Sequence, residues 1–295
     1  MTSWPESVTR WDQPSDLDRV GVHRVSTEWV AGLWKDEDAK LLKIDREGRF
    51  TTNDAGDLLR MTRPFVEFDS QRHFLLGLVG EAPIFVVEAL TEGPVHSLRE
   101  IGFQLGDLER DIASAATAVT NWHRAEPRCG RCGNPTEVIN GGFARECRTD
   151  DLQIFPRSDP AVIVAIVDDQ DRLLLAGQTS WPEKRVSVLA GFVEAGESME
   201  QAVHREILEE VDVQLSDVRY FGSQPWPFPR SLMIGFAARA KTTDISPDGD
   251  EIGYADWFTR DRVRAEVASG ELSLPNQSSI ASRLISAWLQ GTLEL

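Results

Sequence analysis

Residues 199–211 constrain the fold most strongly, because this one predicted helix carries both an apolar stripe and a cluster of carboxylates. Ser198, with Gln201 three residues later, forms a capping box that starts the helix at Met199. The apolar side chains that recur at helical spacing along one face are Met199, Val203, Ile207 and Val211. A stripe of this kind is buried against another element, so we expect the helix to lie on a sheet.

The acidic residues of the same helix are crowded on a second face. At 100° per residue, Glu206 and Glu210 lie about 40° apart, and Glu209 lies about 60° to the other side of Glu206. Like charges this close repel each other, so the face is either solvated or occupied by a cation. Because Mg²⁺ and Mn²⁺ prefer oxygen ligands, an anchored carboxylate cluster of this kind suits a hard divalent ion.

The helix is part of a longer pattern, G-x5-E-x7-R-E-U-x-E-E-x-x-U, in which U is aliphatic. Its specified positions are Gly191, Glu197, Arg205, Glu206, Ile207, Glu209, Glu210 and Val213. The pattern resembles the Nudix box, which has a Gly where this chain has Asp212. We expect Asp212 to take the left-handed conformation of that Gly at the helix end, since Asp tolerates it better than most residues. A small loss of stability and an intact site should follow.

The resemblance implies a mixed-sheet α/β/α sandwich that hydrolyses a nucleoside diphosphate linked to another group. It assigns catalytic roles to three residues: Glu206 and Glu210 as inner metal ligands, and Glu209 as a ligand or a group that positions water. The backbone of Ala190 is assigned to the same metal site. About two to three Mg²⁺ or Mn²⁺ ions would neutralise the pyrophosphate and generate hydroxide from bound water.

Three other box residues are assigned structural roles by the resemblance. Gly191 opens the box, and Arg205 would orient the carboxylates. Glu197 would bind metal through water or pair with Arg205, and an ordinary surface ion pair explains the same two residues equally well.

The segment "DEIGYADW" contributes one more acidic candidate. By the same resemblance Glu251 is a metal ligand, although its neighbours Asp248 and Asp250 are alternatives. The segment is not a calcium-binding EF-hand, because position twelve counted from Asp244 is Ala255 rather than Glu.

The segment "SQPWPFPRS", residues 223–231, is rich in proline and aromatic residues. Its prolines predict a stiff loop that presents aromatic side chains, which would either pack into the core or stack on a ligand. The string resembles the array that marks NADH pyrophosphatases among the Nudix proteins, which narrows the substrate to NADH, NAD⁺ and related dinucleotides. The residues assigned to substrate binding on this basis are Phe192, Gln224, Trp226, Phe228 and Ser231.

The three cysteines fall within one short segment, so they are not a disulfide framework. Cys129, Cys132 and Cys147 resemble the zinc ribbon that precedes the Nudix domain in this group, with Asp150 in place of the fourth cysteine. A carboxylate oxygen ligates zinc, so the four side chains would still close a tetrahedral site. The alternative is a degenerate ribbon that folds without metal, with its thiols as small buried groups.

Strand and helix signals mix along the chain without regular βαβ alternation, which predicts a mixed α+β fold. We expect an N-terminal strand-rich α+β domain over residues 1–126, a zinc-ribbon-like insert over 127–156 and a Nudix sandwich over 157–295. Strands are predicted at 74–80, 83–90, 230–240 and 254–260, a strand hairpin across 168–171, and helices at 108–124 and 278–290.

The formal net charge of −17 predicts a surface that repels nucleic acid and anionic lipid. Residues 1–12 lack the basic and apolar regions of a signal peptide. The longest apolar run, residues 161–167, is far shorter than the roughly 20 residues that cross a bilayer. We therefore expect a soluble, cytoplasmic protein that does not contact a membrane.

Together the box and the array predict a diphosphatase that releases NMN(H) and AMP from NAD(H), and that also removes NAD caps from RNA 5′ ends. Given the negative charge, selectivity on RNA should depend mostly on the cap. The resemblance also implies a homodimer. Two alternatives are a hydrolase of ADP-ribose or another nucleoside diphosphate, and a silent nucleotide-binding regulator, against which the intact Glu206, Glu209 and Glu210 argue.

Overall fold

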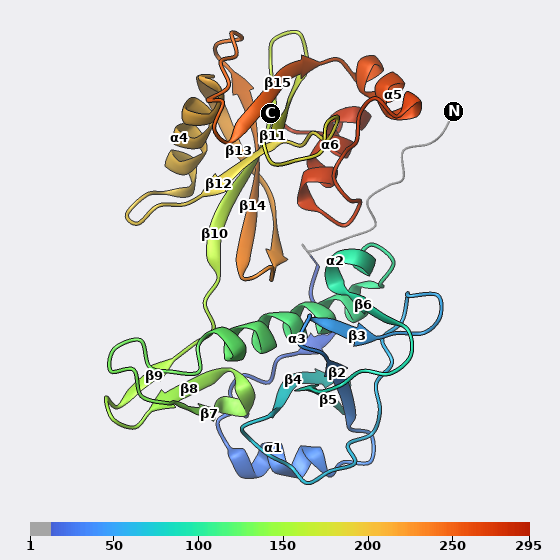
Figure 1. Ribbon diagram of the computed structural model, residues 1–295, viewed down its shortest axis with the longest axis vertical. Coiled ribbons are helices and arrows are strands. Elements are labelled where there is room, and N and C mark those ends of the chain that lie inside the picture. The colour runs from blue at the N-terminus through green and yellow to red at the C-terminus, as the bar shows by residue number, and fades with distance from the viewer. Residues whose placement is uncertain (1–12) are drawn as a thin grey trace. The chain divides into compact units, whose positions relative to one another are not determined.

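The computed structural model describes residues 13–295, so the expectation for residues 1–12 lies outside the described part of the chain. Those residues form two compact units (Figure 1). The N-terminal unit contains residues 13–158 together with the short segment Trp226–Arg230. The C-terminal unit contains residues 159–225 and 231–295. None of the described helices is both long and apolar enough to cross a membrane.

The C-terminal unit is built on a mixed sheet with the strand order β13-β14-β10-β11-β15. Its strands are β10 (Asp159–Val167), β11 (Leu173–Gln178), β12 (Leu189–Phe192), β13 (Leu215–Trp226), β14 (Ser231–Ala240) and β15 (Ile252–Phe258). β10 pairs in parallel with β14 and antiparallel with β11 and β12, while β11 pairs antiparallel with β15. The mixed sheet that the sequence predicted is confirmed.

Helices cover both faces of this sheet: α4 (Met199–Val211) on one, and α5 (Arg260–Ser269) and α6 (Ile280–Gln290) on the other. β10 shows the arrangement most clearly. Val162 and Val164 belong to the buried cluster that includes Ile207 of α4, whereas Ile163 belongs to the cluster that includes Trp288 of α6. A strand buried on both faces reads as a continuous apolar run, which explains residues 161–167. The expected α/β/α sandwich is therefore confirmed.

The local signals around α4 are also confirmed. The Ser198 hydroxyl accepts a hydrogen bond from the backbone N–H of Gln201, and the side-chain oxygen of Gln201 accepts one from the backbone N–H of Ser198. The helix ends at Asp212, which has φ 57° and ψ 32° and so lies in the left-handed region. The predicted hairpin forms as well, with Val167 opposite Leu173.

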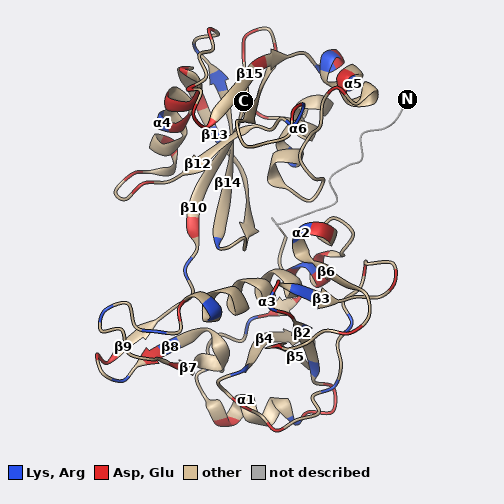
Figure 2. Cartoon of the chain, in the orientation of Figure 1, with Lys and Arg blue, Asp and Glu red and all other residues tan. Residues whose placement is uncertain are grey.

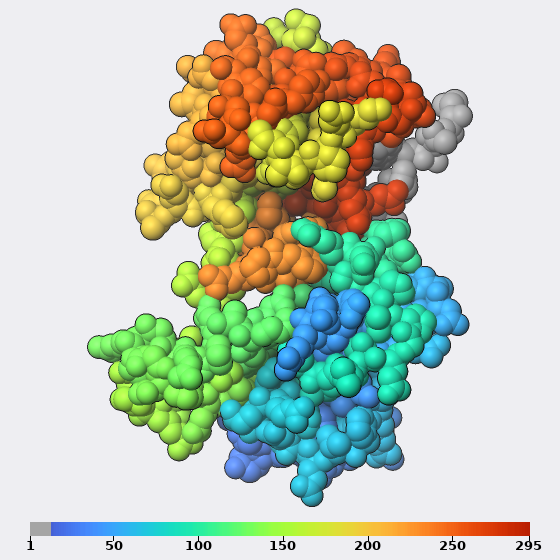
Figure 3. Space-filling view, in the orientation of Figure 1, coloured from blue at the N-terminus to red at the C-terminus, as the bar shows by residue number. Residues whose placement is uncertain are grey.

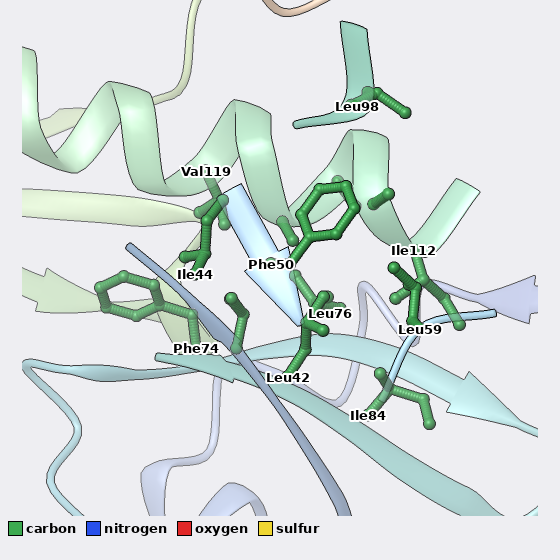
Figure 4. Close-up of a cluster of buried hydrophobic side chains, with 14 of the residues drawn as sticks. Leu42, Ile44, Phe50, Leu59, Phe74, Leu76, Ile84, Leu98, Ile112 and Val119 are labelled. Carbon is green, nitrogen blue, oxygen red and sulfur yellow. The ribbon is translucent and has the colours of Figure 1, made fainter. Parts of the chain in front are cut away.

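The N-terminal unit contains a second sheet, with the strand order β1-β4-β5-β2-β3-β6. The strands are β1 (Leu17–Asp18), β2 (Lys40–Ile44), β3 (Arg49–Thr51), β4 (His73–Val79), β5 (Ala82–Glu88) and β6 (Val95–Ser97). The long helix α3 (Asp107–Ala125) covers one face, and Figure 4 shows its Ile112 and Val119 beside Ile44, Phe50 and Leu76. α1 (Thr27–Trp34) covers the other face, and α2 (Leu98–Ile101) precedes α3.

The cysteine-bearing insert forms a small antiparallel sheet of β7 (Glu137–Ile139), β8 (Ala144–Cys147) and β9 (Leu152–Ile154), with a 3₁₀ turn, η1 (Asn140–Gly142), between the first two. The segment 223–231 differs in part from the predicted loop, because β13 continues through Trp226. Only Pro227–Arg230 form the turn into β14. Hydrogen bonding along β13 thus holds the first half of the segment extended.

Candidate functional site

Gly191 of β12 allows the helix α4 to place a carboxylate directly on the sheet. A Cβ atom at this position would lie 1.9 Å from the carboxyl carbon of Glu206 and 2.2 Å from both of its oxygens. No residue other than glycine fits there without displacing the Glu206 side chain. β12 is in turn held against β10, with Gly191 opposite Val162 and Ala190 opposite Ile163. The sheet therefore fixes where the acidic face of α4 begins.

Arg205 connects the acidic residues around this point. Its guanidinium forms a two-point ion pair with Glu197, with both N–O distances at 2.9 Å. Nη1 also contacts the carboxylates of Glu206 at 2.9 Å and Glu209 at 3.1 Å, and Nη2 donates to the backbone oxygen of Phe192. Hydrogen bonding to Arg205 is the main reason that the pKa of Glu197 is lowered. Arg205 thus holds the carboxylates in place, and the ion-pair interpretation of Glu197 fits this geometry.

Glu210 is the buried member of the cluster, with only 4% of its surface exposed. Its Oε2 atom has no hydrogen-bond partner among the described residues. Burial, followed by repulsion from Glu251 and Glu206, raises the pKa of Glu210 to about 8. A buried carboxylate without a donor is costly, and a divalent cation would supply the missing partner. The residues present therefore fit a hard metal ion.

Glu251 lies immediately before β15, which is the strand that pairs with β11. Of the charges that raise the pKa of Glu210, Glu251 has the largest effect. Asp248 differs, because its Oδ1 already accepts the backbone N–H groups of Asp250, Glu251 and Ile252. This turn uses the Asp248 carboxylate and leaves that of Glu251 with one contact, 3.3 Å from Nε2 of Gln178. Glu251 is therefore the better candidate of the acidic residues in this segment.

Two predicted substrate contacts in the C-terminal unit differ sharply in exposure. Phe192, beside the box glycine, is 59% exposed and free to stack on a ligand. Gln224 is 3% exposed, its Nε2 donates to the backbone oxygen of Ser278, and its Oε1 accepts from the backbone N–H of Ile280. Both groups of the Gln224 amide are thus used to fix the start of α6. Ser231 is half-buried at the first position of β14.

Trp226 and Phe228 belong to the N-terminal unit. Their rings meet edge to face at 5.1 Å, and the guanidinium of Arg99 lies 5.6 Å and 5.4 Å from the two ring centres. Both side chains are half-buried, and Phe228 also packs against the core of that unit. These contacts agree with the alternative that the aromatic side chains pack into the core, at least for Phe228.

The three cysteines and Asp150 come together as the spacing predicted. Their ligand atoms all lie within 4.8 Å of one another. Cys129 Sγ is 3.3 Å from Asp150 Oδ2, and Cys132 Sγ is 3.5 Å from Cys147 Sγ. A tetrahedral zinc with bonds of about 2.3 Å would hold thiolates roughly 3.8 Å apart, so the cluster has about the right size.

Figure 2 shows acidic residues concentrated on helix α4, and Figure 3 shows this helix at the surface of the C-terminal unit. The sequence indicated this cluster and Arg205 as the group that orients it, but not two of the hydrogen bonds around it. The bond from Arg205 to the Phe192 carbonyl, and that from Gln178 to Glu251, join residues that no local pattern connects. A polar residue at a strand end, such as Gln178, is the signal in the sequence that could have indicated the second of these bonds.

The chain is similar to several known proteins. A model of the NUDIX domain matches residues 157–275. The NAD-capped RNA hydrolase NudC of Mycobacterium bovis is 38% identical over 289 residues, which covers 92% of this chain and 92% of that protein. The NAD-capped RNA hydrolase NudC of Deinococcus radiodurans is 38% identical over 74% of this chain and 79% of its own length. A solved NUDIX hydrolase from Nitrosomonas europaea is 25% identical, with a TM-score of 0.36, and covers 46% of this chain and 91% of its own.

Proposed function

Because this chain belongs to the Nudix hydrolase family, we propose that it hydrolyses the pyrophosphate bond of NADH or NAD⁺ and releases NMN(H) and AMP. The same reaction on a capped transcript removes the NAD cap from an RNA 5′ end, which is the activity for which two relatives are named. The unpartnered, buried carboxylate of Glu210 carries this proposal, since hydrolysis of a doubly charged pyrophosphate requires positive charge at this point.

Glu206, Glu210 and Glu251 would hold Mg²⁺ or Mn²⁺, together with Glu209 and the backbone oxygen of Ala190. Bound divalent ions supply charge neutralisation and a water of lowered pKa. The protein contributes orientation: Gly191 leaves room for the Glu206 carboxylate, and Arg205 restrains it. In this proposal Phe192 stacks on a base of the substrate, and Trp226, Phe228 and Ser231 of the recognition segment, residues 223–231, are further substrate contacts.

The test compares initial rates on NADH, NAD⁺, ADP-ribose and an NAD-capped oligonucleotide, each with Mg²⁺ and with Mn²⁺. We expect faster cleavage of the dinucleotides than of ADP-ribose. Glu210→Gln should abolish cleavage, while Glu200→Gln, at an exposed position on the same helix, should not. Equal or faster use of ADP-ribose would favour the second candidate, a general nucleoside-diphosphate hydrolase. Full activity of Glu210→Gln would refute the catalytic assignment.

We also propose that the side chains of Cys129, Cys132, Cys147 and Asp150 bind one Zn²⁺ ion. Elemental analysis of the full chain should give about one zinc per chain, and Asp150→Ala should lose it during dialysis against a chelator. Asp150→Cys should retain it more firmly, because thiolates are softer ligands. Asp151→Asn removes a neighbouring charge outside the cluster and should change nothing. Metal-free wild-type protein that is equally stable would support the degenerate ribbon.

We propose that the protein is a homodimer and that it is located in the cytoplasm. Sedimentation or light scattering of the full chain at several concentrations tests the dimer, and a single species of 32.9 kDa would contradict it. Fractionation of cells that produce the chain tests the location.

A further inference from the structure

The N-terminal unit contains a cavity of about 840 Å³ that shares no residue with the candidate active site. Its walls come from the turn between β2 and β3 (residues 45–49), the start of β4 (71–74), the end of β5 with the following residues (88–91), and the last turns of α3 (120–124). All four segments belong to one compact unit. A cavity of this volume is in the range of small-molecule sites.

The lining of this cavity has a small excess of positive charge, in a chain whose formal net charge is −17. It includes four arginines, Arg46, Arg49, Arg72 and Arg124, and three acidic residues, Asp45, Glu47 and Glu88. Two of the arginines form ion pairs with acidic residues of the lining. Arg49 Nε donates to Asp45 at 2.9 Å, and Arg124 donates to Glu88 from Nε at 3.1 Å and from Nη2 at 2.9 Å.

The other two arginines have unused donors. Arg46 contacts Glu88 only through Nε, at 3.5 Å, and its side chain is 85% exposed. The guanidinium of Arg72 forms no hydrogen bond or ion pair with any of residues 13–295 and is exposed. Guanidinium groups bind phosphate oxygens through paired N–H donors, and two of them balance the roughly 1.5–2 negative charges of a phosphomonoester.

The remaining lining of the cavity offers an apolar surface next to these charges. Phe74 stacks on His123, with ring centres 4.1 Å apart, and forms part of the wall with Ala89. Leu90 is 89% exposed at the same cavity. An inorganic anion would leave this surface in water, whereas a ligand with an organic group would cover it.

We propose that this cavity binds a phosphomonoester of nucleotide size, with its phosphate on Arg46 and Arg72 and its organic group over Phe74, Ala89 and Leu90. The site is independent of the proposed function, because no residue takes part in both. A nucleoside monophosphate has the required charge, size and apolar ring.

The test uses the full chain in a metal-free buffer and measures amide hydrogen–deuterium exchange with AMP, inorganic phosphate or adenosine. AMP should slow exchange in residues 45–49, 88–91 and 120–124. Adenosine should not protect these segments, and inorganic phosphate should protect them only at much higher concentration. The double variant Arg46→Ala/Arg72→Ala should raise the apparent dissociation constant for AMP at least tenfold.

The matched control is Arg60→Ala/Arg63→Ala, which removes two exposed arginines of the same unit that do not line the cavity. It should bind AMP as the wild type does. Three results would overturn the proposal: no protection of the cavity segments by AMP, protection that persists in Arg46→Ala/Arg72→Ala, or equal protection by adenosine. Because binding is measured without hydrolysis, the outcome does not depend on whether the chain cleaves NADH.

Discussion

At the scale of single residues, Gly191 should be the least replaceable position of the site outside the carboxylates. In Gly191→Ala the new methyl group would occupy the space of the Glu206 carboxyl, 1.9 Å away. We expect kcat/KM on NADH to fall at least 100-fold, because a displaced ligand weakens metal binding and loses transition-state stabilisation of about 3 kcal/mol. Steady-state kinetics over a series of Mn²⁺ concentrations checks this.

Gly222→Ala is the matched control for this substitution, since a Cβ at Gly222 of β13 meets no atom within 4 Å. Its kinetics and thermal stability should match those of the wild type. If Gly191→Ala retained wild-type kcat/KM, the position of Glu206 against β12 would be irrelevant to catalysis.

Glu210 predicts an unusual dependence of stability on pH in the metal-free protein. Its pKa is raised to about 8 in the folded state, from 4.5. The folded state then binds more protons than the unfolded state between these values, so stability is fully present below pH 4.5 and is lost as pH rises towards 8. At roughly 1.4 kcal/mol per pKa unit, the loss has an upper bound of about 5 kcal/mol.

Glu210→Gln removes this titration, so its unfolding free energy in EDTA should fall less between pH 5 and pH 8 than that of the wild type. Adding Mn²⁺ at pH 8 should stabilise the wild type and leave the variant nearly unchanged. Denaturant unfolding with and without EDTA measures both effects. If the unfolding free energies of the two proteins changed with pH in parallel, the Glu210 carboxylate would have a hydrogen-bond donor in solution and the prediction would be wrong.

Residues differ in how far the sequence could assign them. Helical spacing places Glu206 and Glu210 on one face of α4, but their roles as ligands come from the resemblance to the Nudix box, as does the place of Asp212 at the helix end. Gln224 could not be assigned in this way, because its partners, Ser278 and Ile280, lie more than fifty positions away. A polar residue within a recognition segment looks the same in sequence whether it binds a ligand or the backbone of a distant helix.

At the scale of elements, a substitution at the C-terminal end of α4 should increase the stability of the protein. Asp212 occupies the left-handed region with φ 57°, where glycine has no steric penalty, and it places a negative charge at the negative end of the helix dipole. Asp212→Gly should stabilise the protein by about 0.5–1 kcal/mol without changing kcat. The reverse change is Gly270→Asp at the end of α5. Gly270 has φ 77°, so this substitution should destabilise the protein. Thermal unfolding measures both, and equal shifts in the same direction would contradict the argument.

The packing of α3 against the cysteine-bearing insert should depend on a neutral histidine. Arg145 Nη1 donates to Nδ1 of His123, so the ring proton lies on Nε2, which donates to the Gly142 oxygen. Burial is the main cause that lowers the pKa of His123 to about 4, and Arg145 contributes. The unfolded state then binds the extra proton between pH 6.5 and 4, so stability is present above pH 6.5 and is lost on acidification.

The expected loss is up to about 3 kcal/mol at roughly 1.4 kcal/mol per pKa unit. His123→Asn should remove this part of the pH dependence, whereas His204→Asn, at an exposed position, should retain it. Hydrogen exchange of the α3 amides at pH 4.5, 5.5 and 6.5 reports on this unit. The same pH dependence in His123→Asn and wild type would indicate a histidine that is protonated without cost.

Elements were predictable where their signal is local. The capping box at Ser198 and the hairpin before Leu173 each depend on a few consecutive residues. The parallel pairing of β10 with β14 joins residues about seventy positions apart, and no periodicity encodes which strands become neighbours. For the same reason the sequence did not indicate that Trp226–Arg230 would belong to the N-terminal unit.

At the scale of the whole molecule, the negative charge conflicts with a nucleic-acid substrate, and local sites must resolve the conflict. The cluster of Glu206, Glu209, Glu210 and Glu251 is acidic and, in the function proposed above, would attract the cap only through bound cations. The cationic cavity of the N-terminal unit has free donors on two arginines. Neither provides the row of phosphate contacts by which basic proteins follow an RNA strand. The chain should therefore recognise the cap and little of the body that follows it.

Hydrolysis of NAD-capped RNA should therefore depend only weakly on salt. A protein with 6–10 phosphate contacts loses roughly 10³–10⁵ in affinity between 50 and 200 mM salt. With a formal net charge of −17, this chain should instead show an apparent KM for a capped oligonucleotide that stays constant within about threefold over that range, or falls as repulsion is screened. NADH, assayed at the same salt concentrations, corrects for salt effects on the metal site. A steep rise in KM for the capped oligonucleotide alone would reveal extended contacts with RNA phosphates and would contradict cap-limited recognition.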